Sequence, residues 1–212
     1  MAKSSPSLRI EIAPKFCCHD WALLKQKLSG DGRWESFQTA WSEAICVVNS
    51  RIQKRFLDVI DSLTPLPYAG FATLALDCLL LEAIQAFKQG HHTKTSPESK
   101  GAYKAILRSS PHFSRFFSSD QSADDFYTYV RNGLLHDGET RKGYLVKAVG
   151  PLLEARDDGS IRVNRKAFHV ALCREFGDYV GRLSSPTEKQ LRMNLVAAID
   201  GLCERSGAGW KK

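Results

Sequence analysis

The sequence lacks the long apolar runs that membrane insertion or secretion requires. Its most apolar stretch, residues 71–81, is interrupted by Asp77 and ended by Glu82, and is shorter than the roughly 20 residues of a membrane-spanning helix. The N-terminus, M-A-K-S-S-P-S-L-R-I-E-I, has no apolar segment of signal-peptide length. We therefore expect a soluble, cytoplasmic protein with no membrane partner.

Cysteine pairs at zinc-ligand spacing are also missing. In the cytoplasm cysteines stay reduced, and four of the six lie in apolar helical patterns, where cysteine packs as a small hydrophobe. We expect no metal site and no cofactor. The six cysteines are Cys17, Cys18, Cys46, Cys78, Cys173 and Cys203, of which the last four lie in the helical patterns.

The composition has an excess of basic residues. Thirty Lys and Arg against 23 Asp and Glu give +7 and a pI near 9.1, which favours anionic partners without selecting one. With 212 residues, 43% of them hydrophobic, the chain can bury one substantial core. We expect one globular domain.

Apolar residues at helical spacing dominate the chain. A first amphipathic helix is expected over residues 33–62, because its large apolar residues alternate at steps of three and four. Thr64 and Pro65 end it. A second, more apolar helix is expected over residues 68–89, with Gly90 as its stop. The apolar face of the first helix comprises Trp34, Phe37, Trp41, Ile45, Val48, Ile52, Phe56 and Val59.

The second half predicts shorter helices and a small β element. Residues 91–110 indicate a loop with a short helix over 100–107, and a capping box from Ser122 to Asp125 opens the next helix. The turn sequence at 157–159 predicts a β-hairpin over about 144–163. Two final helices are expected over 165–183 and 186–205, with Ser185 as the N-cap of the latter.

These elements predict a mainly α fold, an antiparallel helical bundle with a small β-hairpin. The expected organisation is an N-terminal extension over 1–32 with a short strand or helix, a helical domain over 33–205 and a tail over 206–212.

The stretch Y-V-R-N-G-L-L-H-D-G-E-T-R, residues 129–141, carries a polar helical face. At about 100° per residue, Asp125, Tyr129, Asn132 and His136 share one side of a helix, and Asn132 and His136 are i, i+4 neighbours. Phe126, Val130 and Leu134 lie on the opposite side and should face the core. Arg131 points elsewhere, but its long side chain could reach the polar surface.

An imidazole beside a permanently charged guanidinium suits phosphodiester chemistry, since one moves a proton while the other stabilises developing negative charge. The residues leave a plainer interpretation open, in which Arg131 and His136 merely meet the C-terminal dipole of a surface helix. A similar spacing, from Arg162 to His169, straddles the hairpin end and the next helix and lacks a polar residue after its Arg. We expect it not to be a site.

The run from Arg131 to His136, late in a helix of an all-α chain, resembles the HEPN superfamily (higher eukaryotes and prokaryotes nucleotide-binding domain), whose signature is Arg, a polar residue and then His. The likeness covers residues 33–205, although the motif itself is only residues 131–136. The helix with Asp77 and Glu82 is also similar to the second long helix of bacterial, plasmid- or defence-associated members.

The resemblance implies a metal-independent endoribonuclease that works as a homodimer with a composite site, in a toxin–antitoxin or defence setting. RNA would be cleaved by attack of its 2′-hydroxyl, leaving a 2′,3′-cyclic phosphate. His136 would then be the general base or acid, Arg131 would stabilise the phosphorane, and Asn132 would position the phosphate or the imidazole. An antitoxin or effector protein would be a further partner.

Other residues are candidates for supporting roles. Asp77 and Glu82 lie on a largely buried helix and need partners; either could orient Arg131, and Tyr129 shares the polar face. The candidates for RNA binding are Arg108, Arg115, Arg141 and Lys142. For Arg108 to Phe116, an RNA-stacking edge and a loop capped by core phenylalanines both remain open.

One departure from the family pattern concerns regulation. Many toxins of this superfamily have a Tyr two residues after the His, where a partner nucleotidyltransferase modifies it, and this chain has Gly138 there. Two rival functions keep the fold without the chemistry: a non-catalytic module that binds RNA, nucleotide or a protein, and a dimeric adaptor that uses Tyr129, Asn132 and His136 as an interface. The adaptor predicts a packed His136.

Overall fold

The computed structural model describes residues 10–29, 34–91 and 96–205. Of these described residues, 68% are in helices and the sheets are small, which confirms the mainly α class. Contacts group the chain into two compact units. The boundary between them crosses three long helical segments.

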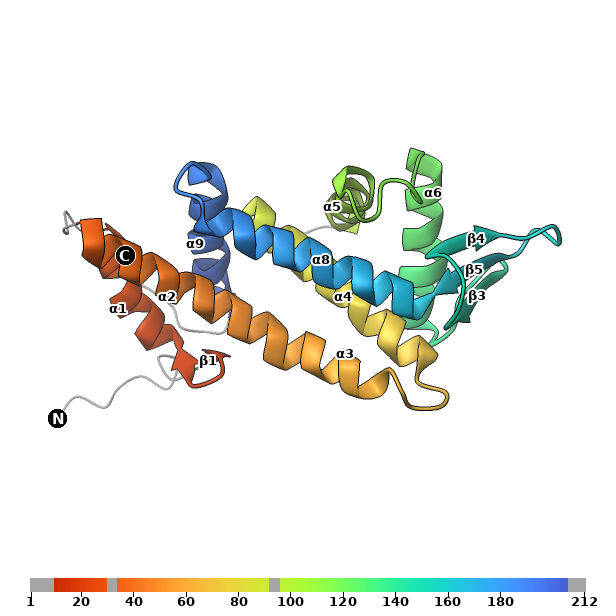
Figure 1. Cartoon of the computed structure of the whole chain (residues 1–212), viewed down its shortest axis with the longest axis horizontal. Helices are drawn as coiled ribbons and strands as arrows, with labels where there is room; N and C mark the ends of the chain where they lie inside the picture. Colours follow the sequence, from red (N-terminus) through yellow and green to blue (C-terminus); the bar gives the residue numbers. More distant parts are fainter. Residues whose placement is uncertain (1–9, 30–33, 92–95, 206–212) are drawn as a thin grey trace. The chain divides into compact units, whose positions relative to one another are not determined.

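Unit 1 comprises residues 1–55, 87–92 and 180–212. Its described part contains strands β1 (Glu11–Ala13) and β2 (Phe16–Cys17), which pair antiparallel, and helix α1 (Cys18–Ser29). It also contains α2 (Trp34–Ile52) and α9 (Lys189–Arg205), together with the ends of α4 and α8 (Figure 1). The described N-terminal strands and α1 thus belong to the same unit as the C-terminal helix α9.

Two tryptophans hold unit 1 together through their indole N–H groups. Trp21 donates to Asp200 at 2.8 Å, and Trp41 donates to the carbonyl of Leu183 at 2.8 Å. The Arg192 guanidinium lies 4.7 Å from the Trp41 ring centroid and also donates to the Leu183 carbonyl. Large apolar rings with one satisfied donor each make these contacts both hydrophobic and directional.

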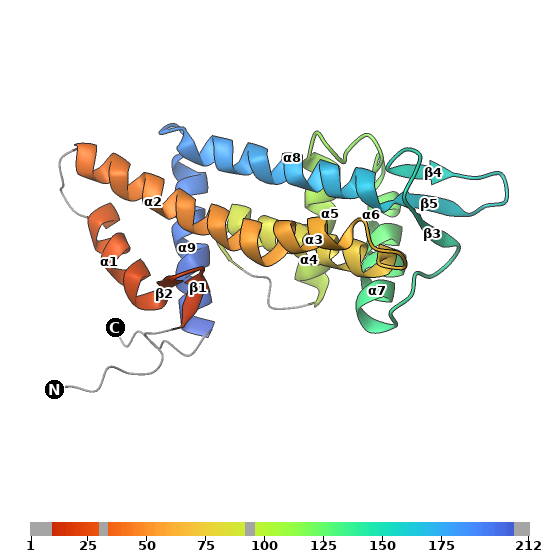
Figure 2. The same ribbon diagram turned by 60° about the horizontal axis from the view of Figure 1, so that its bottom comes forward.

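Unit 2 comprises residues 56–86 and 93–179 and contains all the candidate site residues. Its helices are α3 (Asp58–Leu63), most of α4 (Gly70–Gln89), α5 (Ser96–Ser109), α6 (Asp120–Asp125), α7 (Asn132–His136) and most of α8 (Arg165–Ser184). Within this unit α3 runs opposite to α4 and α8, which run in the same direction (Figures 1 and 2).

The small sheet of unit 2 has three strands, β3 (Tyr144–Lys147), β4 (Leu153–Ala155) and β5 (Ile161–Asn164), in the order β3-β5-β4. The expected hairpin is present, because β4 and β5 pair antiparallel around Asp158 and Gly159. The expected hairpin over 144–163 is nevertheless not two-stranded, because residues 144–155 contain both β3 and β4, and β3 pairs parallel with β5. Gly150, with φ +93°, lies in the connection between β3 and β4.

Phenylalanines from three segments form the core of unit 2. Phe126 stacks on Phe168 of α8 with 5.5 Å between ring centroids, and Phe117 packs edge-on to Phe126 at 5.1 Å. Phe113 contacts Phe168 at 5.1 Å. All four rings are fully buried. The predicted core residues Phe126, Val130 and Leu134 are confirmed, with at most 7% of each exposed.

The first long helix changes its buried face partway along. Trp41, Val48 and Ile52 are buried as predicted, but Val59 is 41% exposed and Leu57 and Ile60 are buried instead. The cause is a π-helical segment, η2 (Gln53–Leu57). A π turn holds more residues than an α turn, so every later side chain is rotated relative to a regular helix, and the prediction for Val59 was wrong.

Helix starts were the least accurate of the predictions. The N-cap before the site helix is Ser119, whose Oγ accepts from the Ser122 N–H at 3.1 Å while Ser122 returns the bond, so Ser122 is the N3 residue and not the cap. Helix α9 begins at Lys189 rather than Pro186, because Ser185 hydrogen-bonds Thr187 in a turn before it. The short helix expected over 100–107 extends over α5, Ser96–Ser109.

Helix α4 is long and apolar enough to cross a membrane by length and composition alone. In its most apolar window, 56% of the residues are buried inside the protein, as in a core helix. Asp77 on this helix is completely buried and hydrogen-bonded to His169.

Candidate active site

The segment that carries the motif is a helix interrupted by a π-helical stretch. Helix α6 leads into η3 (Phe126–Arg131), and α7 continues to His136 (Figure 2). Because the π turns precede Asn132, the regular wheel used to compare Asp125 and Tyr129 with Asn132 and His136 does not hold across this point. Within α7 itself, Asn132 and His136 keep the α spacing of one turn.

Arg131, the last residue of η3, points into unit 2 rather than into solvent. Its Nη2 lies 2.6 Å from Oε2 of Glu82 on α4, and its Nη1 donates to Oδ1 of Asn132 at 2.9 Å. The guanidinium lies 5.2 Å from the ring centroid of Tyr127, and 14% of the side chain is exposed. Three partners therefore fix the plane of the guanidinium.

Glu82 is the anchor of this arrangement. One oxygen accepts from Arg131 and the other accepts from the hydroxyl of Ser99 on α5, so the carboxylate joins three helical segments. Burial alone would lower the pKa of Arg131, but the hydrogen bond and charge of Glu82 outweigh burial and raise that pKa above its ordinary value. The Arg131 Nε is buried with no hydrogen-bond partner among the described residues.

His136 contrasts with Arg131, because it is exposed and makes no hydrogen bond or ion pair within the part of the chain described. It occupies the last turn of α7. Asn132 lies one helical turn before His136. Its side-chain oxygen accepts a hydrogen bond from Arg131 and makes none to the imidazole. The packed histidine expected for an interface-only adaptor is not what the single chain shows.

The loop after α7 folds back over the motif. Gly138, with φ +70°, ends the helix, and the Arg141 N–H donates to the Tyr129 carbonyl at 2.9 Å. A Cβ on Gly133 would lie 2.4 Å from the Glu139 carbonyl oxygen, so only glycine allows this close approach.

The two basic candidates in this loop differ in their partners. Arg141 forms an ion pair with Asp137, so its charge is already balanced. Lys142 lies 4.8 Å from the Tyr129 ring centroid, and its hydrogen bond to Tyr129 raises the pKa of its ammonium group. Lys142 is therefore the better placed of the two to meet an anion.

Asp77 does not support Arg131; it binds His169 instead. Asp77 Oδ1 lies 2.7 Å from His169 Nδ1, and His169 Nε2 lies 3.2 Å from Asp61 and 3.4 Å from the Cys173 sulfur. Burial raises the pKa of Asp77 to about 6 against the opposing effect of His169. Burial disfavours the imidazolium, yet the hydrogen bonds that the ring makes to Asp77 and Cys173 raise the pKa of His169 to about 10.

His169 is thus a buried link between α3, α4 and α8. His169 is also the histidine of the similar spacing from Arg162 to His169. Arg162, on β5, lies 3.6 Å from Glu154. The two residues of that spacing therefore have separate partners.

The remaining RNA-binding candidates serve different structures. Arg108 donates to the Phe117 carbonyl at 3.0 Å and pairs with Asp120, so it stabilises the loop after α5. Arg115 is exposed and lies 4.5 Å from the Phe116 ring centroid. Of the nearby phenylalanines, Phe113 and Phe117 are core residues and Phe116 is only partly buried.

Sequence reasoning missed Ser99 and Tyr127. Tyr127 stands four residues before Arg131, a helical spacing that suggests an aromatic–cation pair, whereas nothing local in the sequence indicates Ser99. In residues 10–29, 34–91 and 96–205, no three His, Cys, Asp or Glu side chains are grouped as metal ligands. In comparisons with known proteins, no family model, no curated protein and no solved structure matches the chain.

Proposed function

We propose that the protein is a metal-independent endoribonuclease of HEPN type whose site is Arg131, Asn132 and His136. The observation that carries the proposal is that two unlike side chains lie within one and a half turns. The Arg131 guanidinium is anchored by Glu82 and Asn132, and the His136 imidazole that follows is exposed and has no partner among the described residues. An anchored cation and a free proton carrier are what cyclising cleavage of RNA requires.

In the proposed reaction the RNA 2′-oxygen attacks the adjacent phosphorus while its proton passes to one imidazole. The bond from phosphorus to the 5′-oxygen breaks, and that oxygen takes a proton from an imidazolium. The products are a 2′,3′-cyclic phosphate and a 5′-hydroxyl. Each chain carries one His136, so we propose a homodimer in which two copies provide the base and the acid.

Arg131 would act through its remaining N–H groups. Nη1 donates one hydrogen to Asn132 and Nη2 donates one to Glu82. The second hydrogen on each nitrogen can then be donated to a phosphoryl oxygen. Glu82 would act as a positioning residue, because it holds the guanidinium plane before RNA arrives. Lys142 beside Tyr129 would supply an additional phosphate contact.

The inward ion pair of Arg131 with Glu82 favours a second candidate function, a non-catalytic module that binds RNA or nucleotide, or a dimeric adaptor. There the pair would only stabilise unit 2 and His136 would only contact the partner. A toxin–antitoxin or defence setting, with a protein antitoxin or effector, belongs to the proposal of cleavage and not to this alternative.

The test is RNA cleavage in EDTA by wild type and by His136→Ala, with analysis of the product ends. We expect cyclic phosphate ends from wild type and at least 100-fold slower cleavage by His136→Ala, about the contribution of one acid–base group. His136 is exposed and has no partner in the described part of the chain, so its removal should leave the unfolding midpoint unchanged. His19→Ala, which removes another exposed histidine, is the matched control. Equal cleavage by His136→Ala and wild type contradicts the proposal.

A further inference from the structure

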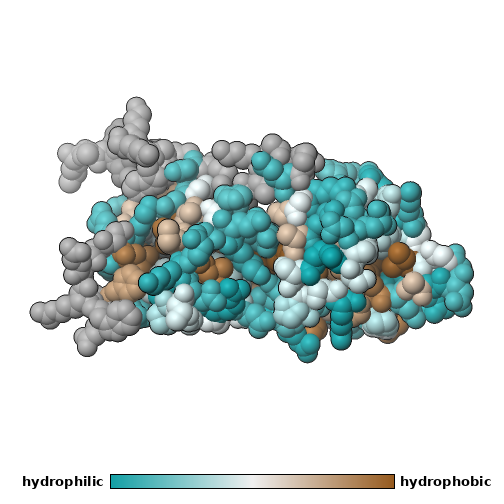
Figure 3. Space-filling view, turned by 90° about the horizontal axis from the view of Figure 1, so that it is seen from above, coloured by the Kyte–Doolittle hydropathy of each residue, from teal (hydrophilic) through white to brown (hydrophobic). Residues whose placement is uncertain are grey.

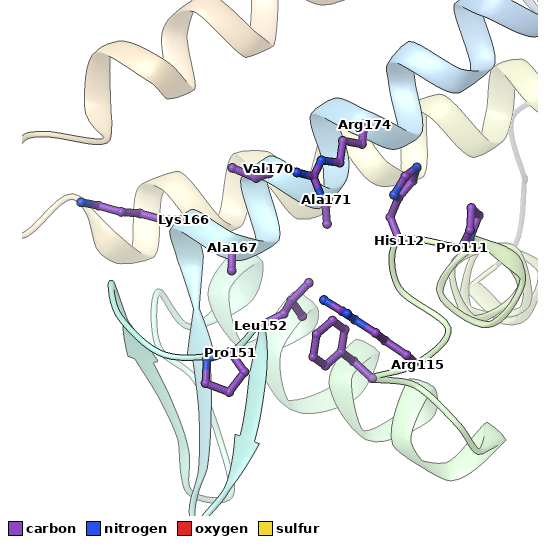
Figure 4. Close-up of a pocket in the computed structure, with 11 residues that line it drawn as sticks. Pro111, His112, Arg115, Pro151, Leu152, Lys166, Ala167, Val170, Ala171 and Arg174 are labelled. Atoms are coloured by element: carbon purple, nitrogen blue, oxygen red, sulfur yellow. The ribbon is translucent and has the colours of Figure 1, made fainter.

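Unit 2 contains a cavity of about 470 Å³ to which the Arg131–His136 segment contributes no residue (Figure 4). It lies between the first half of α8, the segment after α5 and the loop that leads into β4. Cavities of this size fit small organic ligands. Its lining residues are Pro111, His112, Arg115, Phe116, Pro151, Leu152, Lys166, Ala167, Val170, Ala171 and Arg174.

The charged side chains around this cavity are basic. Arg115 and Arg174 come from different elements, both are exposed, and neither forms an ion pair with an acid among the described residues. His112, which also lines the cavity, lies 2.7 Å from Asp178. The Lys166 amine extends away from the other labelled side chains in Figure 4, and its aliphatic stem forms the wall. Two guanidinium groups are thus left without a counter-charge.

The walls between these cations are apolar and partly aromatic. Phe116 lies beneath the Arg115 guanidinium, with 4.5 Å between the guanidinium carbon and the ring centroid. On α8, Ala167 and Ala171 are one turn apart and leave room above the helix, and Val170 beside them is 48% exposed. On the face of the protein seen in Figure 3, hydrophobic residues are exposed among hydrophilic ones.

We propose that this cavity binds one nucleotide unit, with its phosphate between Arg115 and Arg174 and its base against Phe116 and the alanine face of α8. Guanidinium groups bind phosphate oxygens in pairs, and bases stack on aromatic rings and on guanidinium planes. Inorganic phosphate would leave the apolar walls unused, and an apolar ligand would leave the two cations unpaired. The unit could be a free nucleotide or one residue of single-stranded RNA.

The test uses isothermal titration calorimetry on the full chain carrying His136→Ala, so that no cleavage interferes and the outcome is independent of the proposed reaction. The ligands are AMP, adenosine, inorganic phosphate and a 2′-O-methyl RNA tetramer. We expect AMP to bind more tightly than adenosine and phosphate. Tighter binding of the tetramer than of AMP identifies RNA as the source, and equal or weaker binding identifies the free nucleotide.

Three variants locate the binding. Arg115→Ala and Arg174→Ala should each weaken it about tenfold or more, the usual effect of removing a charged hydrogen-bond partner. Arg156→Ala removes an exposed arginine of the β-hairpin, which is not among the cavity residues, and should change nothing. The proposal is overturned by equal affinity in all three variants, by no binding of AMP or RNA at millimolar concentration, or by phosphate binding as tightly as AMP.

Discussion

Glu82 fixes the orientation of the Arg131 guanidinium through a partly buried ion pair. With 24% of the Glu82 side chain and 14% of the Arg131 side chain exposed, the ion pair is shielded from solvent. An isolated buried charge is far more costly than a paired one. Removing one partner therefore costs stability and also releases the guanidinium plane, so stability and activity must be measured together.

The Arg131–Glu82 pair is tested by a double-mutant cycle. Glu82→Gln and Arg131→Met should each lower the free energy of unfolding by about 2–4 kcal/mol, and the double variant should lose less than the sum of the two. Urea unfolding measures all four proteins. The rate of RNA cleavage by Glu82→Gln should be lower than that of wild type, although this variant retains His136. Additive losses would show that the two side chains are not coupled.

His169 makes stability depend on pH in the alkaline range. Its pKa rises from 6.5 to about 10 on folding, so the folded state holds the proton more tightly than the unfolded chain. This stabilisation is complete below pH 6.5 and is lost as the pH rises through about 10. Asp77, raised from 3.8 to about 6, disfavours folding as it ionises between those values, and the imidazolium offsets part of that cost.

We expect His169→Gln to lower the free energy of unfolding near neutral pH by about 2–4 kcal/mol, because Asp77 is left buried without its cation. The difference from wild type should shrink as the pH approaches about 10, where wild type loses the same charge. Urea unfolding at several pH values measures this. In the control His112→Gln, the Asp178 partner is 60% exposed, so the cost should stay below about 1 kcal/mol. A gap for His169→Gln that is constant with pH would contradict this account.

At the scale of elements, the packing of the loop against α7 requires a glycine at position 133. The loop over 137–143 returns so closely that a Cβ on Gly133 would lie 2.4 Å from a backbone oxygen. Gly177 on α8, by contrast, has open space around the same position. The two helical glycines therefore make opposite predictions.

Gly133→Ala should lower the free energy of unfolding by about 1–3 kcal/mol, since backbone must move. Gly177→Ala should raise it by about 0.5–1 kcal/mol, because alanine is the better helix former. Thermal and urea unfolding of both variants measure the two signs. A stabilising Gly133→Ala would mean that the loop does not approach α7 this closely in solution.

At the scale of the whole molecule, the proposed dimer can be tested by mixing chains. We expect light scattering to give twice the 23.7 kDa of one chain. If each cleavage event needs both copies of His136, an equal mixture of wild type and His136→Ala, allowed to exchange subunits, should retain about a quarter of the wild-type activity. Independent chains would retain half. A monomeric mass would remove the composite site from the proposal.

The mainly α fold and the helix cores could be predicted because they depend on local periodicity. The burial of Phe126, Val130 and Leu134 follows from their spacing in the sequence. Val59 could not be placed correctly, since the π-helical segment before it is no feature of apolar spacing. Ser119 was missed as a cap because Ser122 offers the same chemistry three residues later.

By itself, the sequence determined the helical class, the β4–β5 turn and the polar segment from Arg131 to His136, because each is encoded by residues close together in the chain. Only the tertiary structure decided that Glu82 binds Arg131 while Asp77 binds His169, and that Arg115 and Arg174 border one cavity. Both acids lie on α4 at positions that spacing could not distinguish. Their partners come from distant segments, and packing alone selects among such long-range pairs.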